Sequence, residues 1–245
     1  MKQEEKILTR EVVKELGLDK LEVITSDMLD GYTSIGNMAF SGCSSLTSIT
    51  LPNSITSIGV DAFEGCTSLP VEDNLRYADT YLVEAVDKSL STYTIKAGTK
   101  WIGDGAFSGC YSITSITLPN SIINIRQNAF YGCRKLKNVI IGDKIYETQT
   151  VVNGKCKAYK AFNSDLTCRE FKYEEGTYEI EDAPILYGRG FHACLRLTDV
   201  FNYYRGEIGK NIVVHEVELE NVSGKHHDED SKVVAKKITI GKRIL

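Results

Sequence analysis

The sequence predicts an α/β-type solenoid of short parallel strands and short helical turns, with a β-hairpin insertion and a small α+β domain after it. The main evidence is a repeated motif, whose copies begin at Ile35, Ile58, Ile102 and Ile125. A period of about 23 residues is typical of solenoids, in which each unit buries its apolar face against its neighbours. In addition, one stretch between copies breaks the repeat, and the repeat stops after Gly154.

Each copy of the motif predicts which side chains point into the solenoid and which point to solvent. The copy at 46–66 reads LTSITLPNSITSIGVDAFEGC. Its first half alternates, which predicts a short strand with Ile49 and Leu51 pointing inward and Ser48 and Thr50 pointing outward. We expect the phenylalanine of each copy to fill the interior, so that the rings stack as one column. These phenylalanines are Phe40, Phe63, Phe107 and Phe130.

The full pattern L-x-x-I-x-L-P-x-x-I-x-x-I-G-x-x-A-F-x-G-C resembles the BspA-like, treponemal-type class of leucine-rich repeats over about residues 21–152. The resemblance implies a leucine-rich repeat solenoid. It also implies a binding or adhesion role, often at a cell surface, and not catalysis. In one copy Arg126 replaces the corner glycine, so we expect a distorted corner there.

Residues 1–20 are predicted to form a helical cap, because the end coil of a solenoid exposes an apolar surface. Thr9 can act as the N-cap of a helix that ends at Gly17, with Val12, Val13 and Leu16 as its apolar stripe. The alternative is an amphipathic helix that binds a partner.

The solenoid is predicted over residues 21–154, with an irregular insertion at about 70–98. The β-rich runs 75–86 and 93–95 flank Asp87-Lys88-Ser89, which predicts a hairpin that turns at 87–89. Insertions of this kind are often functional, so its aromatic residues could form an exposed patch. The alternative is that these rings only cover the solenoid edge. They are Tyr77, Tyr81, Tyr93 and Trp101.

Residues 155–245 are predicted to form the small α+β domain. Alternation predicts strands at 176–180, 212–219 and 237–240, and Thr198 can cap a short helix that ends at Tyr204. Three segments resemble an uncharacterised domain of bacterial and phage proteins, which brings no known activity. They are Tyr159–Arg169, Gly190–Cys194 and Asp199–Tyr204.

The composition narrows the classes of partner and the compartment. With a net charge of −4 and a pI near 5.7, the 245-residue chain has no electrostatic footprint for nucleic acid. No stretch approaches the roughly 18 apolar residues of a membrane span, so we expect no membrane insertion. The charged N-terminus does not read as a secretory signal, which favours the cytoplasm. The alternative is a cell-surface or secreted protein whose signal has been removed.

Seven cysteines leave at least one unpaired within the chain. Four occupy one repeat position, where parallel side chains favour a ladder of inert, buried thiols over disulfides. These four are Cys43, Cys66, Cys110 and Cys133. His192 and Cys194 are too divergent on one strand to act as base and nucleophile, and with Cys168 they lack the paired spacing of a zinc site. The run 226–230 is read as a solvated loop. We therefore predict no catalytic residue, no metal and no cofactor.

The predicted function is a non-enzymatic module that binds a protein or glycan partner through the repeat face and the insertion. The candidate partner-binding residues are Ser48, Thr50, Tyr77, Tyr81, Tyr93, Ser115, Thr117 and Asn138. Two alternatives remain: an enzyme in the C-terminal domain that uses His192, His215 and Cys194, with the repeats as a targeting arm, or a structural repeat that self-associates through its open edge.

Overall fold

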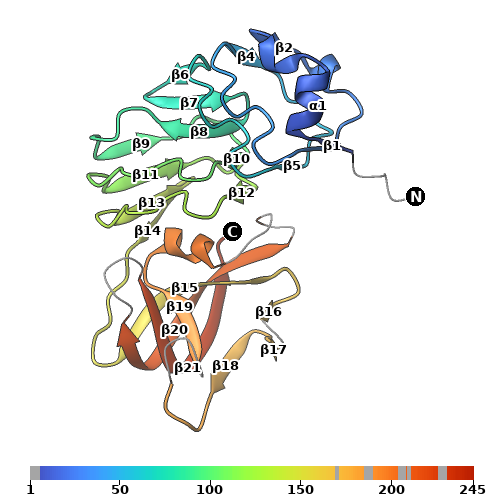
Figure 1. Cartoon of the computed structure of the whole chain (residues 1–245). Coiled ribbons are helices and arrows are strands. Elements are labelled where there is room, and N and C mark those ends of the chain that lie inside the picture. The colour runs from blue at the N-terminus through green and yellow to red at the C-terminus, as the bar shows by residue number, and fades with distance from the viewer. Residues whose placement is uncertain (1–5, 169–170, 185–189, 204–207, 209–210, 226–230) are drawn as a thin grey trace.

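The chain folds into a stack of coils with a curled β-sheet domain at one end (Figure 1). The computed structural model describes residues 6–168, 171–184, 190–203, 208, 211–225 and 231–245. The predicted loop 226–230 lies outside the described residues. None of the helices in the described part of the chain has the length and apolar character needed to cross a lipid bilayer.

The coils place their strands in two rows. The first row comprises β1 (Ile7–Leu8), β3 (Ser34–Ile35), β5 (Ser57–Ile58), β8 (Tyr81–Ala85), β10 (Trp101–Ile102) and β12 (Asn124–Ile125). The second comprises β2 (Val23–Ile24), β4 (Ser48–Ile49), β9 (Thr92–Thr94), β11 (Ser115–Leu118) and β13 (Asn138–Ile141). Pairing within the rows is parallel, and the insertion divides each row into two separate sheets.

The connections between the two rows consist of consecutive tight turns. Cys43 N donates to Phe40 O at 3.0 Å, and the turns of adjacent coils are joined by bonds such as Phe40 N to Ala62 O at 2.8 Å. The glycine before each repeat cysteine lies in the left-handed region, with φ of 77° at Gly42 and 79° at Gly132. A glycine reaches this region at little cost, which explains its place at the turn.

The expected column of phenylalanines forms, but in two halves. Phe40 stacks on Phe63 with ring centroids 5.4 Å apart, and Phe107 stacks on Phe130 at 5.1 Å. Tyr81 packs against Phe63 at 5.4 Å. Tyr93 packs edge-on against Phe107 at 5.3 Å. Strand tyrosines of the irregular segment thus pack against the end of each phenylalanine pair, and the buried residues form two clusters in place of one continuous interior.

The N-terminal segment contains the expected helix, α1 (Arg10–Glu15), in shorter form. The Thr9 side chain accepts a hydrogen bond from Val12 N at 3.4 Å, as an N-cap does, and Gly17 has a φ of 68°. The prediction that Leu16 belongs to the apolar stripe of this helix is wrong. Leu16 follows the last helical residue and is 55% exposed. Two 3-10 helices follow, η1 (Leu18–Lys20) and η2 (Ser26–Leu29). Because β1 precedes α1 and pairs with β3, the first coil begins before residue 21.

The irregular segment is an antiparallel meander of β6 (Val71–Glu72), β7 (Leu75–Ala78) and β8. The hairpin turns at Asp79 and Thr80, so the turn expected at 87–89 is wrong. Asp79 takes a φ of 55°, which Asp tolerates better than most residues, and its Oδ2 accepts from Leu51 N at 2.9 Å. Asp87 Oδ1 instead accepts from Ser89 N at 2.9 Å in a local loop that leads to β9.

The corner at Arg126 keeps the hydrogen bond of the regular corners, so the expected distortion is absent. Arg126 N donates to Ile102 O at 3.0 Å, as Gly103 N does to Leu82 O at 2.9 Å. The guanidinium group reaches the carboxylate of Asp104, with Nε 3.6 Å from Oδ2, and also bonds to the carbonyl of Ile58.

The C-terminal domain is a strongly curled sheet. Its main strands are β15 (Lys155–Asn163), β18 (Gly176–Glu179), β19 (Phe191–Cys194), β20 (Ile212–Lys225) and β21 (Lys232–Arg243), and a small hairpin joins β16 (Thr167–Cys168) to β17 (Phe171–Lys172). β20 pairs with both β15 and β21, so the sheet curls back on itself. The predicted strands 212–219 and 237–240 lie within β20 and β21, and the predicted strand 176–180 matches β18 except for its last residue.

Helical structure in this domain is limited among the described residues to the 3-10 helix η3 (Leu197–Asn202). The α+β class is therefore not confirmed. Arg196, and not Thr198, occupies the N-cap position, and the Thr198 hydroxyl is buried without a hydrogen-bond partner.

The C-terminal domain covers one end of the solenoid. β14 (Lys144–Glu147) adds an antiparallel strand to β13, and the chain then enters β15. One apolar cluster contains Phe130 and Leu136 of the last coils together with Tyr159 and Phe201 of the domain. Gln149 N also donates to Leu195 O at 2.8 Å. The predicted boundary near residue 154 is thus crossed by a shared core.

Candidate functional sites

A polar surface follows the second row of strands near the C-terminal domain, where β9, β11 and β13 stack in Figure 1. Ser115 lies in register between Thr92 and Asn138, and Thr117 lies beside Thr94. We name this surface the strand face. Its members are Thr92, Thr94, Ser115, Thr117, Asn138, Ile140 and, from β14, Ile145. The structure therefore brings the candidates Ser115, Thr117 and Asn138 together on one sheet.

Ser48 and Thr50 point to solvent as predicted, but they lie apart from the strand face. Ser48 pairs with Val23 of β2, in a two-stranded sheet separate from the one that contains β11. Ser48 and Thr50 are both exposed. The polar surface of the solenoid is thus interrupted at the insertion.

The aromatic residues of the insertion do not form an exposed patch. Tyr77, Tyr81 and Tyr93 are 2%, 3% and 4% exposed, and Trp101 is buried as well. Tyr77 lies opposite Leu82 and Tyr81 lies opposite Ala78, so the two rings are on opposite faces of the β7–β8 hairpin, and both faces are covered. Burial raises the pKa of Tyr77 to about 12. The expectation of an exposed patch is wrong, because Tyr77 and Tyr93 belong to one buried cluster and Tyr81 and Trp101 belong to the other.

Two tyrosines that sequence reasoning missed are exposed at the turns leading to the strand face. Tyr111 is 68% exposed and Tyr131 is 54% exposed. They lie on adjacent coils, since a β-carbon on Gly132 would be only 3.1 Å from the ring of Tyr111. The signal was present in the repeat, because the other copies carry Ser, Thr, Glu or Arg at these two positions.

The cysteines of the repeat form the expected ladder of buried thiols. All seven cysteines of the chain are free, and the four repeat cysteines are at most 8% exposed. Cys66 Sγ donates to Phe40 O at 3.1 Å, and Cys133 Sγ donates to Phe107 O at 3.3 Å. Burial raises the pKa of both thiols to about 12, so they are protonated and unreactive near neutral pH.

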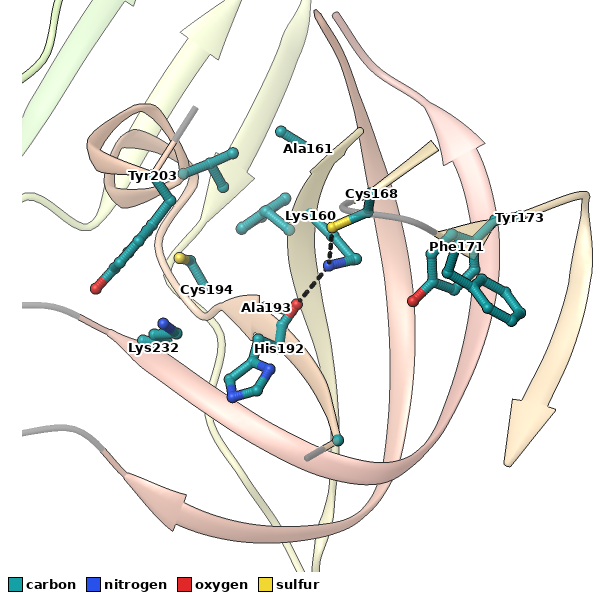
Figure 2. Close-up of a pocket in the computed structure, with 13 residues that line it drawn as sticks. Lys160, Ala161, Cys168, Phe171, Tyr173, His192, Ala193, Cys194, Tyr203 and Lys232 are labelled. Atoms are coloured by element: carbon teal, nitrogen blue, oxygen red, sulfur yellow. Dashed lines mark hydrogen bonds between the residues drawn. The ribbon is translucent and has the colours of Figure 1, made fainter. Parts of the chain in front are cut away.

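A second candidate site is a pocket of about 690 Å³ in the C-terminal domain (Figure 2). Strands β15 and β19 supply its floor, and Lys160 lies in it with only 5% of its surface exposed. Lys160 Nζ donates to His192 O at 3.0 Å and contacts Cys168 Sγ at 3.6 Å. Lys232 Nζ lies 4.4 Å from the centroid of the Tyr203 ring.

The structure brings together part of the constellation considered for catalysis. His192, Cys194 and Cys168 all line the pocket. His215 is elsewhere: its Nδ1 is 2.9 Å from Gly241 O, and its ring packs edge-on against Phe162. Within the described residues, no group of three or more His, Cys, Asp or Glu side chains is arranged to hold a metal ion.

Two family models match the chain. One, described as a BspA type leucine rich repeat region, matches six copies over residues 33–160 and 86–182. The other, described as a domain of unknown function (DUF7666), matches residues 156–245. The overlap of the two matches falls where the shared core joins the last coils to the curled sheet.

Solved bacterial structures are similar over about half of the chain. A leucine-rich repeat protein of T. pallidum is 31% identical, covering 49% of this chain and 58% of that one, with a TM-score of 0.29. A leucine-rich repeat protein of Eubacterium ventriosum is 22% identical, covering 57% and 37%, with a TM-score of 0.32.

A leucine rich cell surface protein of Faecalibacterium prausnitzii is 24% identical, covering 55% of this chain and 41% of that one, with a TM-score of 0.25. The chain thus spans less than two thirds of the length of each of these three proteins. No curated protein matches the chain.

Proposed function

The chain belongs to the BspA-type leucine-rich repeat family, and we propose that it is a non-enzymatic module that binds a protein partner through its strand face. Leucine-rich repeat proteins generally act as protein-interaction modules and are typically not enzymes. We infer in addition that the strand face is the surface that contacts the partner. A glycan is the alternative partner, since the strand face offers small polar side chains such as Ser115 and Thr117.

The observation that carries the proposal is the pair of exposed rings, Tyr111 and Tyr131, at the turns that precede β11 and β13. Tyrosine is enriched among the residues that dominate protein–protein binding energy, whereas serine and threonine are under-represented. The small polar residues of the strand face would then supply complementarity around two aromatic anchors. Ile145, which is 60% exposed, adds an apolar contact at the edge of the same sheet.

A comparative capture experiment tests this role with the full chain. The double variant Tyr111→Ala/Tyr131→Ala should lose proteins that the native chain captures from a bacterial lysate. The control Leu16→Ala/Val71→Ala also removes two exposed apolar side chains, 55% and 48% exposed, but on other surfaces. Equal capture by the double variant and the native chain rejects the aromatic anchors. Capture that is abolished by prior glycosidase treatment of the lysate favours a glycan.

The compartment remains a proposal. Free thiols at all seven cysteines support the cytoplasm, because proteins in oxidising compartments usually form disulfides. The alternative is the cell surface, which the printed name of the F. prausnitzii protein assigns to that protein. Fractionation of the native host with an antibody to the chain separates the two.

Self-association through an open solenoid end is the weaker alternative. The C-terminal domain covers one end of the coils through the cluster that includes Phe130 and Phe201. That end is therefore not free to pair with a second copy. A mass in solution equal to twice the chain mass of 27.3 kDa would revive this alternative.

A further inference from the structure

We propose that a notch on the turn side of the solenoid binds a peptide segment that carries an arginine or lysine side chain. The notch is a pocket of about 440 Å³ at the break between the two halves of the solenoid, where the β6–β8 meander interrupts the coils (Figure 1). One wall is the turn at 60–65, and the other comes from β8 and from the corners at Gly105 and Asn128. The volume falls within the range of roughly 300–1,000 Å³ that is usual for ligand sites.

Two backbone N–H groups of the first wall lack the acceptors that their equivalents have. In the preceding coil the same two positions, Phe40 and Gly42, donate to carbonyl groups of the next coil at 2.8 and 2.7 Å. One coil later these donors are Phe63 N and Gly65 N, which face away from the first coils and toward the break. There β8 replaces the next turn and pairs with β7 and β10. Among the described residues neither N–H group has a hydrogen-bond partner, so this wall favours a ligand with carbonyl oxygens.

The carboxylates of the notch favour a cation. Four carboxylates and one ammonium group line it among the described residues. Asp61 is half-buried and Glu64 is exposed, and neither has an ion-pair partner in the described part of the chain. Asp104 Oδ2 is buried and accepts no hydrogen bond from the described residues, although Arg126 Nε lies 3.6 Å away. A carboxylate oxygen in this state can accept a further N–H group from a ligand.

Other cations around the notch are held by groups of the protein. Lys88 Nζ donates to Ser108 O at 2.8 Å, and Arg76 Nε donates to Glu84 Oε1 at 3.0 Å. The described lining residues lie between 60 and 128, a range in which every residue is described. The two carboxylates without an ion-pair partner are therefore open to the cation of a ligand.

An extended peptide with a basic side chain combines both features. Carbonyl groups two residues apart along an extended chain point the same way, as the equivalent donors Phe63 N and Gly65 N do. The side chain of arginine or lysine adds N–H donors that suit carboxylates. A free amine or guanidine would lack the carbonyl groups, so the proposed occupant is a segment of a protein.

Amide NMR of the full chain tests both features. The probe is the N-acetylated, C-amidated pentapeptide Gly-Arg-Gly-Arg-Gly, and its control carries citrulline in place of both arginines, which keeps the shape and removes the charge. The arginine peptide should shift the amide signals of Phe63 and Gly65 and bind about fivefold tighter than the citrulline peptide. Unchanged signals at both amides with the arginine peptide at millimolar concentration overturn the site. Equal affinities of the two peptides overturn the basic side chain.

Matched carboxylate variants test the charge. Asp61→Asn/Glu64→Gln keeps the size of both side chains, and asparagine tolerates the φ of 52° at position 61. This variant should bind the arginine peptide about fivefold more weakly and the citrulline peptide as the native chain does. The control Glu15→Gln/Asp27→Asn changes two exposed carboxylates outside the notch and should bind both peptides normally. Equal binding of the arginine peptide by the two variants overturns the role of the carboxylates. The site is independent of the strand face, because neither exposed tyrosine lines the notch.

Discussion

Replacing Phe107 by alanine probes the stacked interior of the solenoid where its packing is tightest. The Phe107 side chain is fully buried, stacks on Phe130 with an interplanar angle of 3°, and meets the edge of Tyr93 at 5.3 Å. No other substitution in the second half of the solenoid removes two ring contacts at once. The variant therefore measures how much of the stability depends on this column.

The magnitude follows from burial and ring contacts. Burying a phenylalanine side chain contributes about 1.5–3 kcal/mol. Each of its two aromatic contacts adds about 0.5–1.5 kcal/mol. These contributions add up to about 2.5–6 kcal/mol. The usual cost of Phe→Ala in a core lies inside this range, so we expect the free energy of unfolding to fall by about 3–5 kcal/mol. Tyr131→Ala, at a 54% exposed position, should cost less than about 0.5 kcal/mol.

Urea unfolding followed by tryptophan fluorescence provides the assay. Trp101 is the single tryptophan of the chain and is 4% exposed in the first row of strands, so its emission reports the solenoid directly. Unfolding midpoints and slopes should be compared for the native chain, Phe107→Ala and Tyr131→Ala. A loss below about 1 kcal/mol for Phe107→Ala, similar to that of Tyr131→Ala, would refute the stacked interior.

Three more predictions concern thiols, a corner and an ion pair. Burial raises the pKa of Cys66 and Cys133 to about 12, so these thiols should resist alkylation at pH 8 until the chain unfolds. The free energy of unfolding should fall as pH rises above about 8.5, because the thiols then ionise in the unfolded chain but not in the folded one. Rapid alkylation of the native protein would contradict this prediction. Gly59→Ala should lower the free energy of unfolding in urea by about 1–3 kcal/mol, because the added β-carbon would overlap the backbone of the neighbouring coil. A variant as stable as the native chain would count against that close approach. Hydrogen bonds from Lys155 and Lys237 hold the pKa of Glu220 at about 2. The stabilisation from these two ion pairs should therefore be fully present above the pKa of Glu220 in the unfolded chain and be lost as pH falls toward 2. NMR titration should find this low pKa for Glu220 in the native protein and a higher one in the Lys237→Met variant. A pKa near 4.3 for Glu220 in the native protein would refute the pairing.

The regular part of the fold could be predicted because equivalent residues of adjacent coils have the same surroundings. A residue such as Phe63 stacks on Phe40 because both occupy the same position in adjacent coils. The same logic predicted the buried cysteine ladder and the outward-pointing Ser48. Family membership follows from this pattern, since the family model matches six copies.

The irregular segment could not be placed from the sequence, because no repeat defines its register. The turn at Asp79 depends on a positive φ and on a side-chain bond to Leu51 N, 28 residues earlier. A hairpin turn at 87–89 would fit the composition equally well. With the turn at Asp79, Tyr77 and Tyr81 lie on opposite faces of the β7–β8 hairpin, and each belongs to a different buried cluster, so they do not form one exposed patch.

The C-terminal domain and its pocket depend on long-range pairing that sequence patterns do not encode. β20 pairs with β15 and β21 at once, and this closure places Lys160, Cys168 and Lys232 around one cavity. The same closure covers the end of the solenoid. Expressing the repeats without this domain would therefore expose part of a shared core, and experiments on function should use the full chain.

Side-chain footprinting with hydroxyl radicals, applied to the full chain with and without its captured partner, tests the proposed interaction surface most directly. Tyr111 and Tyr131 are exposed in the free chain and should become protected in the complex, while Phe171 on the C-terminal domain keeps its reactivity. Protection confined to other surfaces, with both tyrosines as reactive as before, would contradict recognition through the strand face.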